Sequence, residues 1–458
     1  MTSRYSPYTS FRPSGAAWLG DIPDHWDVKR VGLLYSESNA RAFSDAEKEY
    51  PILSVSIHDG ISDKEMSDTE LDRKVTRSED RSLYKVVRKN DLTYNMMRAW
   101  QGGFGSARVS GLVSPAYVVC RPRLDTRSKY YELVLRTPNA IAELKRYSRG
   151  ITDFRLRLYW EDFKTIPVPV PPENEQRLIE AFLDHETAKI DWLIAKQERL
   201  IELLKEKRQA VISHAVTKGL NPDAPMKDSG VEWLGDVPAH WKVAKVGHHY
   251  EVVLGKMLDE KRITGEHSAP YLRNTDVQWD RVNTDDLPTM DFSPADRKKF
   301  ELRKDDLLVC EGGEVGRAAL WKGELLECYY QKALHRLRPL KADADLPRFM
   351  FYLLWQASEQ GRFAGPAGKA TIAHLPAETF RQYRFPFPPG DEQEEIVSFL
   401  DDKNAKMDLL VKKARRSIEL MQEHRAALIS AAVTGKIDVR GWQKPSNQPQ
   451  EAATAANA

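Results

Sequence analysis

The 458-residue sequence has only three cysteines, Cys120, Cys310 and Cys328, and they are widely spaced. Their odd number and spacing exclude a disulfide framework and fit a reducing compartment, so a cytoplasmic location is expected. Because no CxxC pair or Cys–His cluster is present, structural zinc is not expected. The N-terminal residues lack the apolar core of a signal peptide, and no run approaches the ~18 apolar residues of a membrane span.

The sequence also lacks the motifs of common nucleotide-binding and catalytic sites. It has no GxxxxGK(S/T) phosphate loop, and no GxGxxG follows a predicted strand. Asn221-Pro222-Asp223 is a turn sequence, not the Asn-Pro-Pro-Tyr motif of adenine methyltransferases, and no suitably placed Glu-x-Lys of a nuclease core follows it. The adjacent His248 and His249 point to opposite faces of a strand and suit a metal poorly. We therefore expect no catalytic residue, no metal site and no cofactor bound by this chain.

Two long stretches, 171–216 and 388–433, share one internal pattern. The first opens PPENEQRLIEAFLDHETAKIDWLI and the second PPGDEQEEIVSFLDDKNAKMDLLV, at a constant offset of 217 residues. Since neither contains proline or glycine after its opening, each is predicted to be one helix of about forty residues, which is ~60 Å long at 1.5 Å per residue.

The apolar residues of both stretches recur every 3.5 residues on average, which is typical of a coiled coil. A seam of this length needs a partner, and the matched register favours pairing of the two helices with each other over two unrelated amphipathic helices. The predicted seam residues are Ile179, Leu183, Ile190, Leu193, Leu200, Leu204 and Val211, and then Ile396, Leu400, Met407, Leu410, Met421 and Leu428.

A second repeat precedes each helix. Trp18 to Trp26 reads WLGDIPDHW and Trp233 to Trp241 reads WLGDVPAHW, so the chain is a tandem duplication of segment and helix. These tryptophans could form a binding face. Because both halves preserve the motif, whereas a specific reader should differ between halves, a structural role that seats each segment against its helix is favoured.

Between motif and helix, each half shows short β-like runs and one amphipathic helix, at 131–145 and 348–360, which indicates an α+β globule of about 150 residues. The two globules match only in patches, such as Lys89-Asn90-Asp91-Leu92 with Lys304-Asp305-Asp306-Leu307. Such divergence on a repeated scaffold is expected when two globules recognise different things.

The net charge of +2 selects no partner, so any electrostatic footprint must be local. The range 81–108 holds six basic residues and one acid, with aromatic residues interleaved, and the second globule has basic stretches at corresponding places. Glycine-rich loops at 98–108 and 311–317 each end in an arginine. Plain turns and solvated faces remain alternatives, but the recurrence favours contact with nucleic-acid phosphates.

Together these features resemble the specificity subunits of type I restriction–modification systems. The residues that carry the resemblance occur twice: Trp18 to Trp26 and Trp233 to Trp241, Pro-Pro-x-x-Glu-Gln at Pro171 and Pro388, and Ala-Val-Thr at 215–217 and 432–434. The resemblance covers nearly everything from Ser14 to Gly441.

The resemblance implies an α+β fold with two α/β globular target-recognition domains. They are joined by two long antiparallel coiled-coil helices in a tandem repeat with pseudo-twofold symmetry. The implied domains are target-recognition domain 1 at 1–170, spacer helix 1 at 171–218, target-recognition domain 2 at 219–387, spacer helix 2 at 388–440, and a disordered tail at 441–458.

The resemblance further implies a non-catalytic subunit that reads an asymmetric, bipartite double-stranded DNA target, with helix length setting the gap between half-sites. Two modification subunits would supply S-adenosylmethionine binding and adenine methylation, and restriction subunits would use ATP and Mg. Candidate DNA-binding residues are Ser54, Ser56, His58, Arg98, Gln101, Arg108, Arg149, Arg155 and Arg157 in the first globule, and Arg273, Asn274, Arg317 and Lys369 in the second. A coiled-coil assembly scaffold without DNA readout is the alternative function, and a self-sufficient DNA enzyme is a third.

Overall fold

The computed structural model describes residues 5–67, 80–123, 126–150, 156–258, 264–341, 344–363 and 374–445. Contacts divide the chain into two compact units, Met1–Gln197 with Arg416–Ala458, and Glu198–Arg415. We call them the first and the second unit. Each contains one globule and a part of both long helices.

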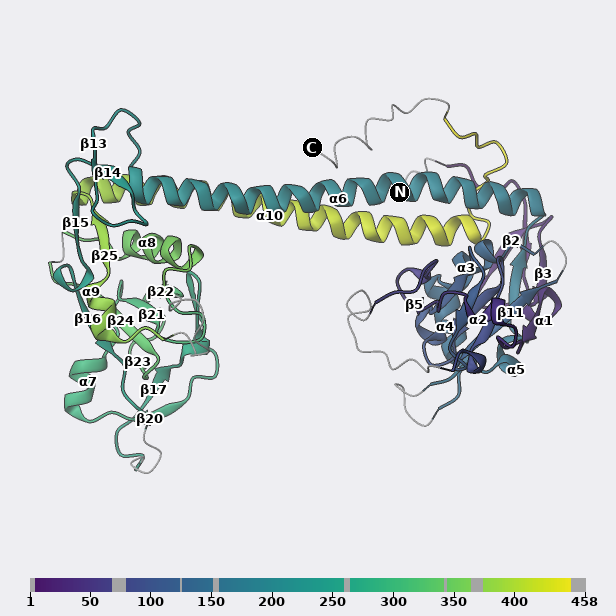
Figure 1. The fold of residues 1–458 in the computed structure, drawn as a ribbon, viewed down its shortest axis with the longest axis horizontal. Coiled ribbons are helices and arrows are strands. Elements are labelled where there is room, and N and C mark those ends of the chain that lie inside the picture. Colours follow the sequence, from purple (N-terminus) through teal and green to yellow (C-terminus); the bar gives the residue numbers. More distant parts are fainter. Residues whose placement is uncertain are drawn as a thin grey trace. The chain divides into compact units, whose positions relative to one another are not determined.

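The two predicted long helices are present. Helix α6 spans Glu173–Lys218 (46 residues) and α10 spans Gly390–Val433 (44 residues) (Figure 1). Acidic residues in both first turns complement the positive end of the helix dipole. In the first unit the start of α6 lies beside the end of α10, and in the second unit the end of α6 lies beside the start of α10 (Figure 1). The helices therefore pair antiparallel, as predicted.

Each globule is built on a four-stranded antiparallel sheet, and the strand order is the same in both. In the first unit the order is β4 (Tyr35–Ser38), β11 (Tyr117–Pro122), β8 (Leu92–Asn95) and β9 (Phe104–Ser106). In the second unit it is β16 (Tyr250–Leu254), β24 (Leu334–Pro339), β21 (Leu307–Cys310) and β22 (Ala318–Leu320). The predicted duplication of an α+β globule is therefore confirmed.

Shorter elements complete the units. The first unit has β1 (Phe11–Pro13), β2 (Asp21–Pro23), β3 (Asp27–Arg30), α1 (Val31–Leu34), α2 (Asp45–Lys48), β5 (Val55–Ser56), β6 (Gly60–Ile61), β7 (Lys85–Val87), β10 (Gly111–Val113), α3 (Ser128–Leu135), α4 (Pro138–Tyr147), α5 (Trp160–Phe163) and β12 (Pro167–Val170). The second has β13 (Met226–Asp228), β14 (Asp236–Pro238), β15 (Lys242–Lys245), β17 (Ser268–Leu272), β18 (Val277–Gln278), β19 (Arg281–Val282), β20 (Thr289–Asp291), α7 (Pro294–Phe300), β23 (Tyr329–Tyr330), α8 (Pro347–Glu359), α9 (Ala377–Gln382) and β25 (Arg384–Phe387).

One helix prediction is corrected. The amphipathic pattern at 131–145 belongs to two helices, α3 and α4, because Pro138 cannot continue the first of them. Thr137 caps the second helix by accepting a hydrogen bond from the backbone N–H of Ala140 (3.4 Å). The corresponding prediction in the second globule, at 348–360, agrees with α8.

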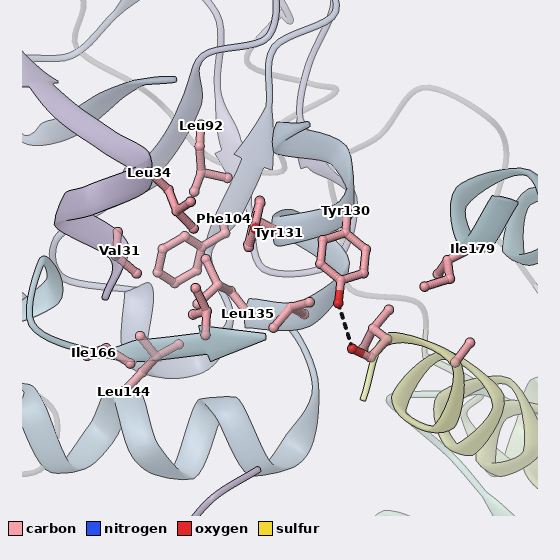
Figure 2. Close-up of a cluster of buried hydrophobic side chains, with 14 of the residues drawn as sticks. Val31, Leu34, Leu92, Phe104, Tyr130, Tyr131, Leu135, Leu144, Ile166 and Ile179 are labelled. Atoms are coloured by element: carbon pink, nitrogen blue, oxygen red, sulfur yellow. Dashed lines mark hydrogen bonds between the residues drawn. The ribbon is translucent and has the colours of Figure 1, made fainter. Parts of the chain in front are cut away.

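The core of the first unit joins the globule to both long helices. Side chains from the sheet and α3, such as Leu92, Phe104 and Tyr131, are buried in one cluster with Ile179 of α6 (Figure 2). The Tyr130 hydroxyl donates a hydrogen bond of 2.9 Å to the backbone carbonyl of Val433, the last residue of α10. The first globule is thus fastened to the start of one long helix and to the end of the other.

Candidate nucleic-acid interface

The repeated tryptophan motif fastens each globule to the first turn of a long helix. In the first unit Trp26 Nε1 donates to Glu175 (3.0 Å), and His25 Nε2 lies 2.8 Å from the same carboxylate. In the second unit Trp241 Nε1 donates to Glu392 (3.0 Å), and His240 Nε2 lies 2.7 Å away. Both Trp26 and Trp241 are fully buried, which agrees with the structural role that was favoured.

One contact at this position occurs in the first unit only. The Tyr8 hydroxyl also donates to Glu175, and burial, followed by this bond, raises the pKa of Tyr8 well above its usual value. At the offset of 215 residues that relates the two motifs, Tyr8 corresponds to Asp223, which cannot make the bond. The glutamate of the first unit therefore holds three donors, and that of the second unit holds two.

The seam between the long helices departs from the prediction at three positions. Leu193, Leu200 and Leu410 are 43%, 40% and 47% exposed, so they lie outside the seam. Ile194, Ile201 and Val411, one residue further along, are partly buried and continue the alternating three- and four-residue spacing from Ile190 and Met407. Since both adjacent positions hold large apolar residues, spacing alone could not choose between them. The other predicted seam residues are buried or partly buried.

Two ion pairs cross between the helices at equivalent positions. In the second unit Arg208 pairs with Asp408, and in the first unit Arg425 Nε lies 2.9 Å from Asp191 Oδ1. Arg425 is the repeat equivalent of Arg208, and Asp191 is that of Asp408, both at the offset of 217. The pairing of the helices is therefore reciprocal, as expected of an antiparallel coil built from two copies of one sequence.

Each unit also presents equivalent apolar residues on the outer surface of its helices. The first unit exposes Trp192, Leu193 and Leu420, and the second exposes Leu409, Leu410 and Leu203 at the same repeat positions. In heptad terms, Leu193 and Leu410 flank the seam on the side opposite Asp191 and Asp408. These exposed apolar residues thus recur at equivalent repeat positions in the two units.

The DNA-binding candidates of the first globule lie in three places: around Arg98, around Arg149, and near β5 at the groove lined by His58 and Arg108. Arg98 and Gln101 are joined by a hydrogen bond of 2.8 Å, and the exposed side chain of Arg149 pairs with Asp162. The backbones of Arg149 and Arg157 pair with each other, which exposes both side chains on one edge. Arg155 lies outside the described residues.

Near β5, the Ser56 hydroxyl accepts a hydrogen bond of 3.0 Å from the backbone N–H of His58, which fixes the turn that exposes His58. The Ser54 backbone pairs with Ser62, so the side chain of Ser54 has no role in that bond. His58 and Arg108 line the same groove of about 720 Å³, which lies between the globule and the ends of α6 and α10. The structure thus brings His58 and Arg108 to one site, whereas Arg98 and Gln101 do not line it.

In the second globule the side chains of the DNA-binding candidates are engaged in intramolecular hydrogen bonds. Arg273 is bound bidentately by Asp276, and this pairing raises the pKa of the guanidinium. Asn274 donates to the carbonyl of Gly312 (2.7 Å), and its side-chain oxygen accepts from Arg317 (3.0 Å). With these bonds in place, Asn274 is not free for the bidentate contact to adenine that was considered for it. Lys369 lies outside the described residues.

Comparison with known proteins shows which proteins have similar features. Residues 238–420 match the type I restriction modification DNA specificity domain. The chain is 22% identical to the type I restriction enzyme MjaVIII specificity subunit of Methanocaldococcus jannaschii, over 92% of this chain and 94% of that protein. It is 24% identical to the EcoKI specificity subunit of Escherichia coli, over 61% of this chain and 60% of that protein.

This chain is similar to the type I specificity subunits. Two solved structures share its fold at 16% identity. One is the HsdS subunit from Thermoanaerobacter tengcongensis, with a TM-score of 0.56 over 91% of this chain and 98% of that one. The other, described as the structural basis of complex assembly and conformational transition of the type I R-M system, has a TM-score of 0.69 over 91% and 99%.

The resemblance to type I specificity subunits that the repeated motifs indicated is therefore confirmed. The matched specificity domain begins at Pro238 in the second globule and ends at Leu420 within α10. The relatives are named as specificity subunits, which agrees with a non-catalytic recognition subunit. None of the helices in the described ranges is both long and apolar enough to pass through a membrane.

Sequence reasoning about this chain missed the residues that hold its framework. Glu175 and Glu392 were read only as part of the opening Pro-Pro-x-x-Glu-Gln, and Arg208 with Arg425 were not considered. The signal was available, because each pair is related by the same offset of 217. Trp442, at the start of the tail expected to be disordered, packs its ring against Phe182 at a centroid distance of 5.7 Å, and only its aromatic character could have indicated this.

Proposed function

We propose that this chain is the DNA sequence-specificity subunit of a type I restriction–modification complex and reads an asymmetric, bipartite target with its two globules. The observation that carries the proposal is the contrast within the repeat. The sheet order, the Trp–Glu contacts and the Arg–Asp pairs are duplicated, whereas the loops at the sheet edges differ. Two readers of one design with different contact residues suit two different half-sites.

The exposed apolar positions on the helices support the binding of partner proteins. Since Trp192, Leu193 and Leu420 are matched by Leu409, Leu410 and Leu203, two copies of one partner could bind in equivalent ways. We assign this surface to two modification subunits, which would bind S-adenosylmethionine and methylate adenine. Restriction subunits using ATP and Mg would complete the complex. This chain would supply recognition and assembly and no catalytic group.

The test is to coexpress the chain with its modification subunits and to map methylated adenines in the host DNA. A split motif with two unlike halves and a fixed unread gap is expected. Arg98→Ala, in an exposed loop of the first globule, should relax one half only, while Arg30→Ala, an exposed arginine at the end of β3, should leave both intact.

Two results would count against the proposal. Equal loss of discrimination in both halves after Arg98→Ala would mean that the first globule does not read a half-site by itself. Methylation that is unchanged by any globule substitution, together with no salt-dependent DNA affinity, would favour the assembly scaffold. Turnover by the purified chain without partners would favour a self-sufficient enzyme.

A further inference from the structure

A two-residue element at the edge of the first sheet places two cations side by side. The backbone N–H of Asn90 donates to the carbonyl of Ala107 (2.8 Å), and the N–H of Ala107 donates to the carbonyl of Asp91 (2.9 Å). These bonds extend the β8–β9 pairing by one step and bring the adjacent Lys89 and Arg108 next to each other. Asn90 has a positive φ of 71°, which turns the chain sharply at this point.

The second globule has the same two backbone hydrogen bonds at the equivalent place. The N–H of Asp305 donates to the carbonyl of Trp321 (2.8 Å), and the N–H of Trp321 donates to the carbonyl of Asp306 (2.8 Å). Asp305 has a φ of 69°, nearly that of Asn90. Lys304 and Lys322 therefore occupy the places of Lys89 and Arg108.

The buried acid within each turn is already neutralised. Asp91 is held by Arg121 (2.9 Å) and Asp306 by Arg338 (2.6 Å), and both aspartates are 1% exposed. These two arginines hold the aspartate of each turn in place and keep its carboxylate from pairing with the exposed cations on either side of the turn. Lys89, Arg108, Lys304 and Lys322 are all exposed, and within the described ranges none of their side chains has an ion-pair or hydrogen-bond partner.

The groove of the first unit shows which surface the charges of Lys89 and Arg108 face. Lys89 and Arg108 line it together with residues of α6 and α10. The acids in its wall are Asp59, Glu132 and Asp184, but Glu132 pairs with Arg136 (3.0 Å) and Asp184 with Lys129 (2.5 Å). The charge left unpaired in the groove is therefore mainly positive, which suits an anionic strand.

We propose that Lys89 with Arg108, and Lys304 with Lys322, are two equivalent clamps for DNA backbone phosphates. The assignment to phosphates and not to bases follows from the repetition, because globules that read different half-sites would share only contacts that carry no sequence information. This inference rests on the proposed DNA-reading function. The second clamp is the weaker one, since the exposed Asp305 stands where the first has Asn90.

The test uses the full chain in complex with its modification subunits, bound to a labelled target duplex and to a duplex with scrambled half-sites. Four variants are compared over a salt series: Lys89→Ala with Arg108→Ala, Lys304→Ala with Lys322→Ala, all four together, and the control Lys298→Ala with Lys436→Ala. The two control lysines are exposed and lie outside the repeated turns. Each lost phosphate contact should reduce the slope of log K against log salt by about 0.9, hence by about 3.6 for all four.

Affinity for the two duplexes should fall by the same factor, so that the ratio between them is unchanged, and Lys89→Arg should keep the wild-type slope. An unchanged slope in the fourfold variant, or a loss confined to the target duplex, would overturn the proposal, the latter because it would make these residues base readers. Failure of the proposed function would look different. The wild-type complex would then not prefer the target duplex, although the slopes could still be compared on the scrambled one.

Discussion

The junction between the helices and the globule differs between the two units although the helices themselves repeat. In the first unit it is an open groove of about 720 Å³, lined on the helix side by Thr187, Arg425 and Ile429. In the second unit the equivalent positions, Asn404, Arg208 and Ile212, line a space of about 210 Å³. That space is narrowed by aromatic residues of the second globule, Trp279, Phe351, Tyr352 and Trp355.

The ion pairs at this junction differ in the same way. Lys129 makes a single contact with Asp184 in the first unit. At the equivalent place in the second unit, Arg348 contacts Asp401 (2.8 Å) and also Asp280, and its guanidinium lies over the ring of Phe351 (4.7 Å). The helices thus provide one attachment surface, and each globule satisfies it with its own side chains. The contacts between the two helices are therefore repeated, whereas the contacts between each globule and the helices are specific to its unit.

The largest expected effect compares the glutamates that hold the tryptophan motifs. Glu175→Ala leaves the buried donors of Tyr8 and Trp26 unpaired, whereas Glu392→Ala leaves only that of Trp241. The side chains of His25 and His240 are 37% and 50% exposed, so water replaces the glutamate there. Because unpaired buried donors cost about 1–3 kcal/mol each, we expect a loss of ~4 kcal/mol in the first unit and ~2 kcal/mol in the second. Denaturant unfolding, followed by hydrogen exchange in each unit, measures both.

Glu173→Ala is the control for the first unit, since this glutamate pairs with the exposed Arg177. Glu394→Ala, an exposed position on α10, is the control for the second. Equal losses from Glu175→Ala and Glu392→Ala would mean that Tyr8 adds nothing to the motif of the first unit.

The second-largest expected effect is a difference in stability loss between residues of the seam and exposed residues of the helices. Ile194→Ala should destabilise the first unit by about 1–2 kcal/mol, because it removes partly buried methyl groups from the seam. Leu193→Ala, one residue away and 43% exposed, should change stability by less than ~0.5 kcal/mol. In the second unit the matched pair is Val411→Ala and Leu410→Ala, with the same order. A larger loss at Leu193 than at Ile194 would return Leu193 to the seam.

These particular residues show how far the sequence could be read. The offset of 217 predicted two matched helices that pair with each other, because it repeats spacing and register together. The repeated tryptophan motif predicted the duplicated globules, and the resemblance to type I specificity subunits implied the antiparallel direction of the helices. The offset could not decide between Leu193 and Ile194, since both are large and apolar and the choice depends on the packing of the partner helix. Nor could it show that Asn274 and Arg273 are engaged by Arg317 and Asp276, because those contacts are made by the folded loops.

A smaller effect is a pH dependence of folding stability that is expected in the second unit and not in the first. His335, on β24, is fully buried and donates through Nε2 to the carbonyl of Leu375 (2.8 Å), whereas the first sheet has Val118 at this position. Burial lowers the pKa of His335 below 6.5. Below that pH the unfolded chain takes up a proton that the folded second unit does not, so stability is complete above 6.5 and decreases as the pH falls towards the lowered pKa.

Hydrogen exchange of the second unit between about pH 7.5 and about pH 5.5 should therefore show a loss of stability of ~1 kcal/mol, absent from the first unit. His335→Val, which introduces the residue of the first sheet, should remove this pH dependence. The control His248→Ala, at an exposed position, should keep it. The same pH dependence in the His335→Val chain would assign the effect to other groups.

The smallest effect concerns the reciprocal ion pairs between α6 and α10. Asp191 and Arg425 are 51% and 40% exposed, and Asp408 and Arg208 are 65% and 28% exposed. Solvent at such positions limits each pair to a coupling of about 0.2–1 kcal/mol, so single alanine variants should hardly change stability. Because the pairs are equivalent, a double-mutant cycle of Asp191→Ala and Arg425→Ala should give nearly the coupling found for Asp408→Ala and Arg208→Ala.

Arg425→Asp should cost more than Arg425→Ala, because it places two carboxylates together, and adding Asp191→Arg should recover the difference. If this exchange recovered stability in the first unit, but the matched exchange of Arg208 and Asp408 did not do so in the second, the helices would not be reciprocal in register. The equivalence of their exposed apolar residues would then fail as well.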